Sequence, residues 1–177
     1  MDKNTIYLIF TKNNTLFSKA IGVYTKHEYN HVSIALDTNF STVYSFGRKQ
    51  FNNPFLAGFV EENLHDQFFQ EASCTIYSCE ITLSQSNEIQ RVIKQFIKQK
   101  NLYKYNFLGL FGVMFGKSIP RANAYFCSQF VAYVLLKAGI NHLNKPLGLT
   151  TPQDIELIAG LNCIYQGKVH SMLQKNM

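Results

Sequence analysis

Two residues of this chain have the types and surroundings that cysteine-based hydrolysis requires. Cys127 stands near the start of the apolar run at residues 125–140, whose pattern predicts a helix, and His31 opens the strand-like run at residues 31–36. The positive backbone field at a helix N-terminus favours a thiolate over a thiol. An imidazole on a stiff strand can hold or accept the thiol proton. The sequence therefore predicts a cysteine nucleophile with a histidine base, and the histidine comes first along the chain.

The residues around this pair resemble a known enzyme family. His31 lies in the motif H-V-S-I-A-L, Cys127 lies in Y-F-C-S-Q-F-V-A-Y-V-L, and residues 44–48 read Y-S-F-G-R. Together these motifs resemble the permuted papain-like branch of the NlpC superfamily of cysteine hydrolases, which includes YiiX-like proteins and lecithin retinol acyltransferase. The resemblance covers most of the chain, from residue 6 to the segment after Pro152. It implies an α+β, papain-like fold in which an antiparallel sheet packs against helices and the nucleophile lies at a helix N-terminus.

Such enzymes orient the imidazole with a third residue, and the resemblance places Ser45 at that position. Family members often carry a histidine there, in a pattern like F-I-H-A, so Ser45 departs from the family. A serine hydroxyl orients an imidazole less strongly than a histidine or a carboxylate does. Three alternatives follow. Ser45 holds His31 weakly, or a backbone carbonyl or Glu61 or Glu62 takes over, or Ser45 is an ordinary strand serine.

Five further residues are candidates for binding a substrate. Tyr105 and Asn106 fall where this branch often carries a Tyr-Asp pair before the nucleophile, although a helix start with buried rings is the simpler interpretation. Arg48 is able to clamp a substrate carboxylate, and a solvated arginine is again the simpler alternative. Ser128 is a polar neighbour of the thiol on its helix. Glu62 completes the set from the segment that follows Arg48.

Composition predicts one enzyme-sized domain over residues 1–177. The chain is 46% apolar, which is enough for a sizeable core. Its net charge of +6 comes from scattered lysines without a dense basic run, which indicates a solvated surface and no nucleic-acid partner. The apolar run at residues 6–10 has no cleavage site behind it, so we expect a buried strand, no signal peptide and a cytoplasmic location.

The cysteines and the apolar segments bear on cofactors and membranes. The four cysteines fit free thiols, and no C-x-x-C occurs, so we expect neither zinc nor another cofactor. Cys74 and Cys79 lie an odd number of residues apart on one expected strand, which places them on opposite faces. Residues 107–115 are far fewer than the ~20 needed to span a bilayer. They predict a core segment or a pocket wall and no transmembrane segment.

Apolar periodicity predicts helices packed on an antiparallel sheet. Strands are expected over residues 6–11, 31–36, 42–46, 74–83 and 163–165. Helices are expected over residues 15–24, from Ser84 or Ser86 to 97, over 125–140 and from Thr151 to about 160, with Asn123 or a neighbour as the cap before Cys127. Residues 48–70, rich in Asn, Phe and Gly, predict a long loop that is a candidate lid.

These features predict a cysteine hydrolase that works through a Cys-His thiolate. By the resemblance, its substrate is an amide in a small peptide, such as a fragment derived from the cell wall. A first alternative is hydrolysis or transfer of a lipid acyl ester, as in the lecithin retinol acyltransferase relatives. A second is a binding module that kept the fold and lost efficient turnover, which a weak third residue would favour. The oligomeric state does not follow from the sequence.

Overall fold

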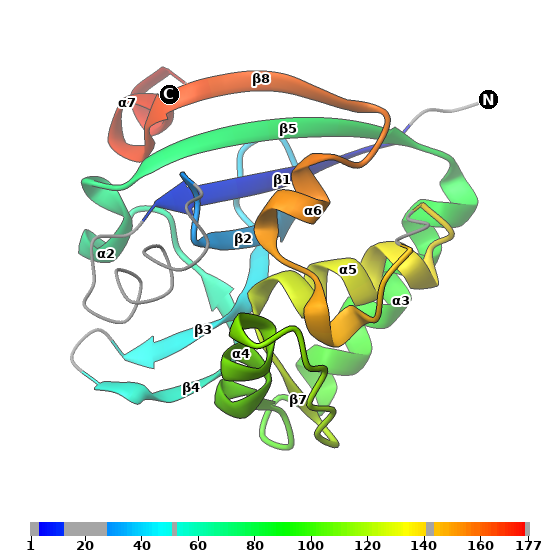
Figure 1. Cartoon of the computed structure of the whole chain (residues 1–177). Helices are drawn as coiled ribbons and strands as arrows, with labels where there is room; N and C mark the ends of the chain where they lie inside the picture. The colour runs from blue at the N-terminus through cyan, green and yellow to red at the C-terminus, as the bar shows by residue number, and fades with distance from the viewer. Residues whose placement is uncertain (1–3, 13–27, 51–52, 141–143, 176–177) are drawn as a thin grey trace.

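A six-stranded antiparallel sheet forms the centre of the protein, in a computed structural model that describes residues 4–12, 28–50, 53–140 and 144–175 (Figure 1). The strands lie in the order β4-β3-β2-β1-β5-β8. Their bounds are β1 (Asn4–Lys12), β2 (His31–Ala35), β3 (Val43–Gln50), β4 (Asn53–Glu62), β5 (Ser73–Ile81) and β8 (Leu161–Lys168). Each strand predicted from the sequence has its counterpart among them, so the expected sheet is confirmed.

Helices pack on both faces of this sheet. They are α2 (Gln67–Gln70), α3 (Leu83–Lys98), α4 (Phe107–Met114), α5 (Cys127–Lys137), α6 (Pro152–Glu156) and α7 (Val169–Lys175), with a 3₁₀ turn, η1, at Leu147–Leu149. In Figure 1, α3, α5 and α6 gather on one side of the molecule, and α2 and α7 lie together at the other. The fold is therefore α+β, as predicted. The helix expected over residues 15–24 lies outside the described residues.

Strand alternation divides the core into two layers. On β1, Leu8 faces the layer that α3 and α5 cover, and Ile9 faces the layer that α2 and α7 cover. The same alternation separates Cys79 from Cys74 on β5, as their odd spacing predicts. Both thiols are free. None of the helices in the described part of the chain is long and apolar enough to cross a membrane.

Aromatic rings join the α3 and α5 layer to the sheet. Phe46 of β3 contacts Phe96 of α3 and Phe130 of α5, with ring centroids 5.9 and 5.3 Å apart. Phe59 of β4 contacts the same two rings at 5.5 and 5.6 Å. Such pairs contribute about 0.5–1.5 kcal/mol each beyond the area that they bury. They hold α5, which begins with Cys127, against β3 and β4.

The prediction of a long loop over residues 48–70 is wrong. β3 continues to Gln50, β4 returns beside it, and α2 follows. Gly47 pairs with Gly58 across the two strands. β4 forms one edge of the sheet, where glycine and proline are tolerated because one side of the strand needs no partner. Because of its glycine and proline, β4 does not show the alternating pattern of a strand in the sequence. The segment predicted as a candidate lid is a hairpin at the edge of the sheet.

Helix ends differ from the sequence expectation at two starts and at the end of α6 (Pro152–Glu156), which stops short of the expected residue 160. Thr82 caps α3 in a capping box, in place of the expected Ser84 or Ser86. Thr151 caps α6 as predicted. Gly139, which follows the end of α5, has the expected left-handed conformation with φ of 67°. The other misplaced start is that of α5, which forms part of the candidate site.

Candidate active site

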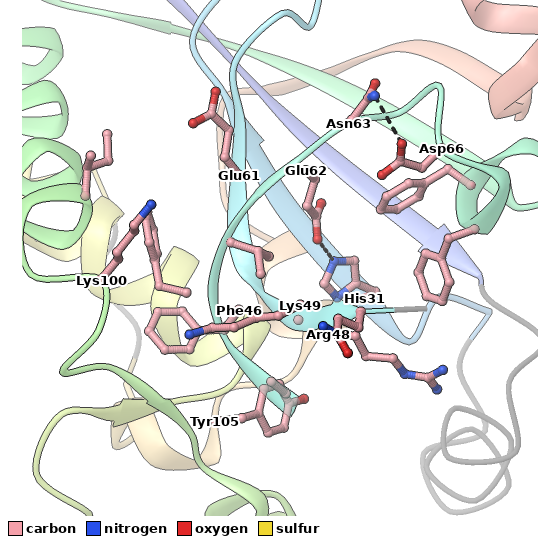
Figure 2. A pocket seen from close by; sticks show the side chains of 18 of the residues that line it. His31, Phe46, Arg48, Lys49, Glu61, Glu62, Asn63, Asp66, Lys100 and Tyr105 are labelled. Atoms are coloured by element: carbon pink, nitrogen blue, oxygen red, sulfur yellow. Dashed lines mark hydrogen bonds and ion pairs between the residues drawn. The ribbon is translucent and has the colours of Figure 1, made fainter. Parts of the chain in front are cut away.

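The His31 ring is held by a carboxylate from the neighbouring hairpin. Its Nε2 lies 2.7 Å from Oε1 of Glu62, the last residue of β4 (Figure 2). The two side chains are only 14% and 6% exposed, so water competes weakly for this contact. The other Glu62 oxygen accepts a hydrogen bond from the hydroxyl of Ser33, two residues along β2. The ring orientation is therefore set from two strands.

The same ring lies close enough to Cys127 for the sulfur to act on its protonation. Because Nε2 faces Glu62, Nδ1 is the nitrogen left for the thiol. Burial disfavours a charged imidazole, but the Glu62 carboxylate and Cys127 outweigh it and raise the pKa of His31 well above its ordinary value. The geometry thus favours an imidazolium beside the sulfur, which is the partner that a thiolate needs.

Cys127 is the first residue of α5. Phe126 takes the N-cap position with an extended backbone, and no side chain caps the helix. The N–H groups of the first turn therefore lack intrahelical partners and provide a positive end beside the sulfur. The expected cap, Asn123, lies before β7 (Ala124–Tyr125), where its φ of 54° turns the chain. The start of α5 can stabilise a thiolate or an oxyanion.

Two cavities lie beside the pair. A wide one of about 810 Å³ is lined by His31 and by residues of β3, β4 and α2. A narrow cleft of about 40 Å³ is lined by Cys127, and Asn30 and Tyr105 line both spaces. The apolar wall of the cleft comes from α4 and consists of Leu110, Val113 and Met114. Residues 107–115 thus include a pocket wall, one of the two roles predicted for them.

Tyr105 is placed at the site, as predicted. It lies in β6 (Lys104–Tyr105), which pairs with β7 so that Tyr105 lies opposite Tyr125, two residues before Cys127. Burial, reinforced by the nearby Cys127, raises the pKa of Tyr105 well above its ordinary value, while Arg48 acts in the opposite direction. The phenol therefore stays protonated and can donate a hydrogen bond at neutral pH.

Arg48 also reaches the site. It lines the wide cavity, and its guanidinium carbon lies 5.6 Å from the centre of the Phe68 ring. Figure 2 shows Arg48 and Tyr105 on the side of His31 opposite to Glu61 and Asp66. The prediction that Arg48 belongs to the substrate-binding region is consistent with this position.

The roles expected for Ser45 and Glu62 must be corrected. Ser45 is fully buried, and its hydroxyl donates a 2.8 Å hydrogen bond to the carbonyl of Val32, so it is not the residue that holds His31. Glu62, one of the alternatives considered for that role, holds the imidazole. It is therefore a partner of His31, and its assignment to substrate binding is not supported.

Asn106 and Ser128 have structural roles. The Asn106 side chain accepts a hydrogen bond from the Gly109 N–H at 2.9 Å and donates one to the Ile119 carbonyl at 3.2 Å, so it caps α4. The Ser128 hydroxyl donates to the Thr150 carbonyl at 2.7 Å. Their side chains are thus engaged within the fold, and the helix-start interpretation of Asn106 is correct.

Ser33 is a site residue that the sequence reasoning did not select. The signal was present, because Ser33 lies two residues from His31 and therefore shares its strand face. Gly47 is a second one. A side chain added there would begin 3.5 Å from Oε1 of Glu62 and 3.7 Å from Cε1 of His31. No group of three or more potential metal ligands occurs among the described side chains.

Comparison with known proteins does not identify this chain. No protein-family model matches it, and no curated protein matches it at a significant level. Its function must therefore be inferred from the geometry around His31 and Cys127 and from the short motifs that contain them.

Proposed function

We propose that this protein is a cysteine hydrolase of the permuted papain-like type. The observation that carries the proposal is the position of the His31 imidazole, which interacts with Cys127 on one side and with Glu62 on the other. A histidine that only stabilises a core needs no thiol at a helix start beside it. Here the thiol begins α5 and lines a cleft next to a large cavity. This arrangement supports a nucleophile, a proton carrier and an orienting carboxylate.

The proposed reaction has two halves. The Cys127 thiolate attacks the acyl carbonyl, and N–H groups in the first turn of α5 stabilise the tetrahedral oxyanion. The His31 imidazolium then gives its proton to the leaving amine as the C–N bond breaks and a thioester remains. In the second half, neutral His31 takes a proton from water, the hydroxide attacks the thioester, and the carboxylic acid and thiolate separate. Glu62 keeps the ring oriented and favours its charged form throughout.

A small amide is the substrate class that the cavities favour. The wide cavity is lined by charges of both signs, which suit the polar groups of a peptide: Arg48, Lys49, Lys100, Glu61 and Asp66. The cleft at Cys127 is narrow, with a volume of about 40 Å³. Such a narrow space suits a small group better than a long lipid chain. A carboxylate as third residue also removes the reason for favouring a binding module.

The first test compares the reactivity of Cys127 with that of Cys163, an exposed free thiol in the same chain. Labelling with limiting iodoacetamide near pH 6, followed by peptide mapping, should modify Cys127 first. Cys163 is more accessible but has no imidazole partner among the described residues, and burial raises the pKa of Cys74 to about 12. His31→Ala should abolish the advantage of Cys127, with circular dichroism as the control for folding.

The second part of the test is turnover. Small N-acyl amides and dipeptides are assayed beside short-chain thioesters and phospholipid esters, with Cys127→Ala as the blank. Release of amine above the blank supports the amidase, and turnover of esters alone would replace it with the lipid alternative. Labelling of Cys163 before Cys127, together with no turnover above the blank, would contradict the proposal.

A further inference from the structure

We propose that the substrate carries a carboxylate close to the scissile bond and that Arg48 binds it. The inference rests on the proposed role of Cys127 as nucleophile and names the substrate class as amides of carboxylate-bearing molecules, such as acylated amino acids or short peptides. The site consists of Arg48, its aromatic support Phe68, and Tyr105, which connects the wide cavity with the cleft at Cys127.

Arg48 is held in place but keeps its hydrogen-bonding capacity. Phe68 lies 5.6 Å from its guanidinium carbon and supports one face of the planar group. Within the described ranges, no carboxylate forms an ion pair with Arg48; the pairs found there are His31 with Glu62, Arg91 with Glu88 and Lys145 with Asp154. A guanidinium supported by a ring and unpaired beside a cavity is suited to a planar, two-pronged oxyanion.

Arg48 also lies in electrostatic reach of the reacting centre. Tyr105 lines the wide cavity together with Arg48 and the cleft together with Cys127, and the charges of both residues act on the pKa of its hydroxyl. A carboxylate bound by Arg48 would therefore lie in the wide cavity, next to the residue that joins it to the cleft at Cys127. This position suits an anionic group on the residue next to the cleaved bond.

The surrounding charges favour an anion at this place. Glu61 and Asp66 lie beyond His31, on the other side from Arg48 (Figure 2). The Glu62 carboxylate is already occupied by His31 and Ser33. Together with a His31 imidazolium, the guanidinium leaves this part of the cavity positive.

The test uses two alkylating reagents that differ only in charge. Iodoacetate places a carboxylate next to its reactive carbon, and iodoacetamide is its neutral analogue. The measured quantity is the ratio of the iodoacetate to the iodoacetamide rate constant at Cys127. His31 also attracts the anion, so the contribution of Arg48 is read from the change in this ratio between the wild type and an Arg48 variant. Arg48→Gln should lower this ratio about tenfold, as expected for the loss of one charged hydrogen bond.

Matched variants separate the effect of the planar guanidinium geometry from the effect of its charge. Arg48→Lys keeps the charge but loses the planar geometry, so its ratio should lie between those of the wild type and Arg48→Gln. Lys94→Gln removes one positive charge from the exposed face of α3, outside both cavities, and should leave the ratio as in the wild type. An equal effect of Lys94→Gln would assign the result to net charge and overturn the proposal. An equal fall for both reagents in Arg48→Gln would assign Arg48 to the integrity of the site and also overturn it.

A second experiment, with substrates, shows whether the carboxylate site or the proposed hydrolase activity has failed. N-acyl amino acids are compared with their carboxamide counterparts, and Arg48→Gln should reduce kcat/KM about tenfold for the carboxylates only. If nothing is turned over but the iodoacetate ratio still depends on Arg48, the carboxylate site stands and the hydrolase fails. If amides are turned over and Arg48→Gln changes neither ratio, the hydrolase stands and the carboxylate site fails.

Discussion

At the scale of single residues, the proximity of Cys127 and His31 was predictable from the sequence, and the role of Glu62 as the partner of His31 was not. Cys127 and His31 carry local signals, namely a thiol before an apolar helical run and a histidine that opens a strand. Glu62 lies beside Glu61, and the choice between them depends on the strand register. β4 pairs Glu62 with Val43 and thereby determines which acid faces His31. No property of the two adjacent acids encodes that register.

We expect Glu62→Gln to lower the pKa of His31, because the change removes the carboxylate charge that raises it and keeps the shape of the side chain. The imidazolium is then lost at a lower pH, so the alkaline limb of the kcat/KM profile should move to lower pH. Glu61→Gln, on the same strand but without contact to His31, is the matched control and should leave the profile in place. The profile, or an NMR titration of His31, measures the shift. No shift in Glu62→Gln would remove Glu62 from its proposed role.

The same linkage predicts how the pair affects folding. A histidine whose pKa is higher in the folded state stabilises the fold fully below its unfolded pKa of about 6.5. That contribution declines as the pH rises through the folded value. Glu62→Gln should therefore reduce the free energy of unfolding more at pH 6 than at pH 10, as urea titrations at the two values would measure.

At the scale of elements, the site forms where β3 separates from β2 and their pairing ends. The two strands form a ladder of only two residue pairs. Where the ladder ends, Ser45 satisfies the Val32 carbonyl with its side chain, and Gly47 leaves space beside His31. The strongly periodic elements β1, β5, α3 and α5 were predictable from the sequence. β4 was not, because an edge strand with glycine and few alternating apolar residues resembles a loop.

Ser45→Ala tests this account of the strand junction. It should lower the free energy of unfolding by about 1–3 kcal/mol, because the buried Val32 carbonyl loses its partner. The pH profile of Cys127 alkylation should stay as in the wild type. Ser84→Ala, at an exposed position on α3, is the control and should change stability by less than about 0.5 kcal/mol. A pH shift like that expected for Glu62→Gln would restore Ser45 as the third residue.

At the scale of the whole molecule, the site depends on the packing of α3 and α5 against the sheet through aromatic rings. His31 and Glu62 belong to the sheet, and Cys127 belongs to the helix layer. The general α+β architecture was predictable from the periodicity of the segments. The aromatic cluster was not, because its rings come from four elements and contact one another only after the layers have assembled.

Phe96→Ala should lower the free energy of unfolding by about 3–5 kcal/mol, because it removes a buried ring that contacts both the sheet and α5. Phe111→Ala is the matched control. Phe96 is 2% exposed and Phe111 is 53% exposed, so the same substitution on α4 should cost far less. Urea unfolding of the two variants measures the difference, and equal losses would contradict a cluster that holds the layers together.

The order of the residues along the chain has a consequence for biosynthesis. Glu62 follows His31 by 31 positions, whereas Cys127 comes only after β5, α3 and α4 have been made. On the ribosome, His31 and Glu62 therefore emerge before Cys127. A nascent chain in which α5 has not yet docked lacks the Cys127 neighbour of His31. The proposed acylation of Cys127 therefore requires that α5 has first packed on the sheet.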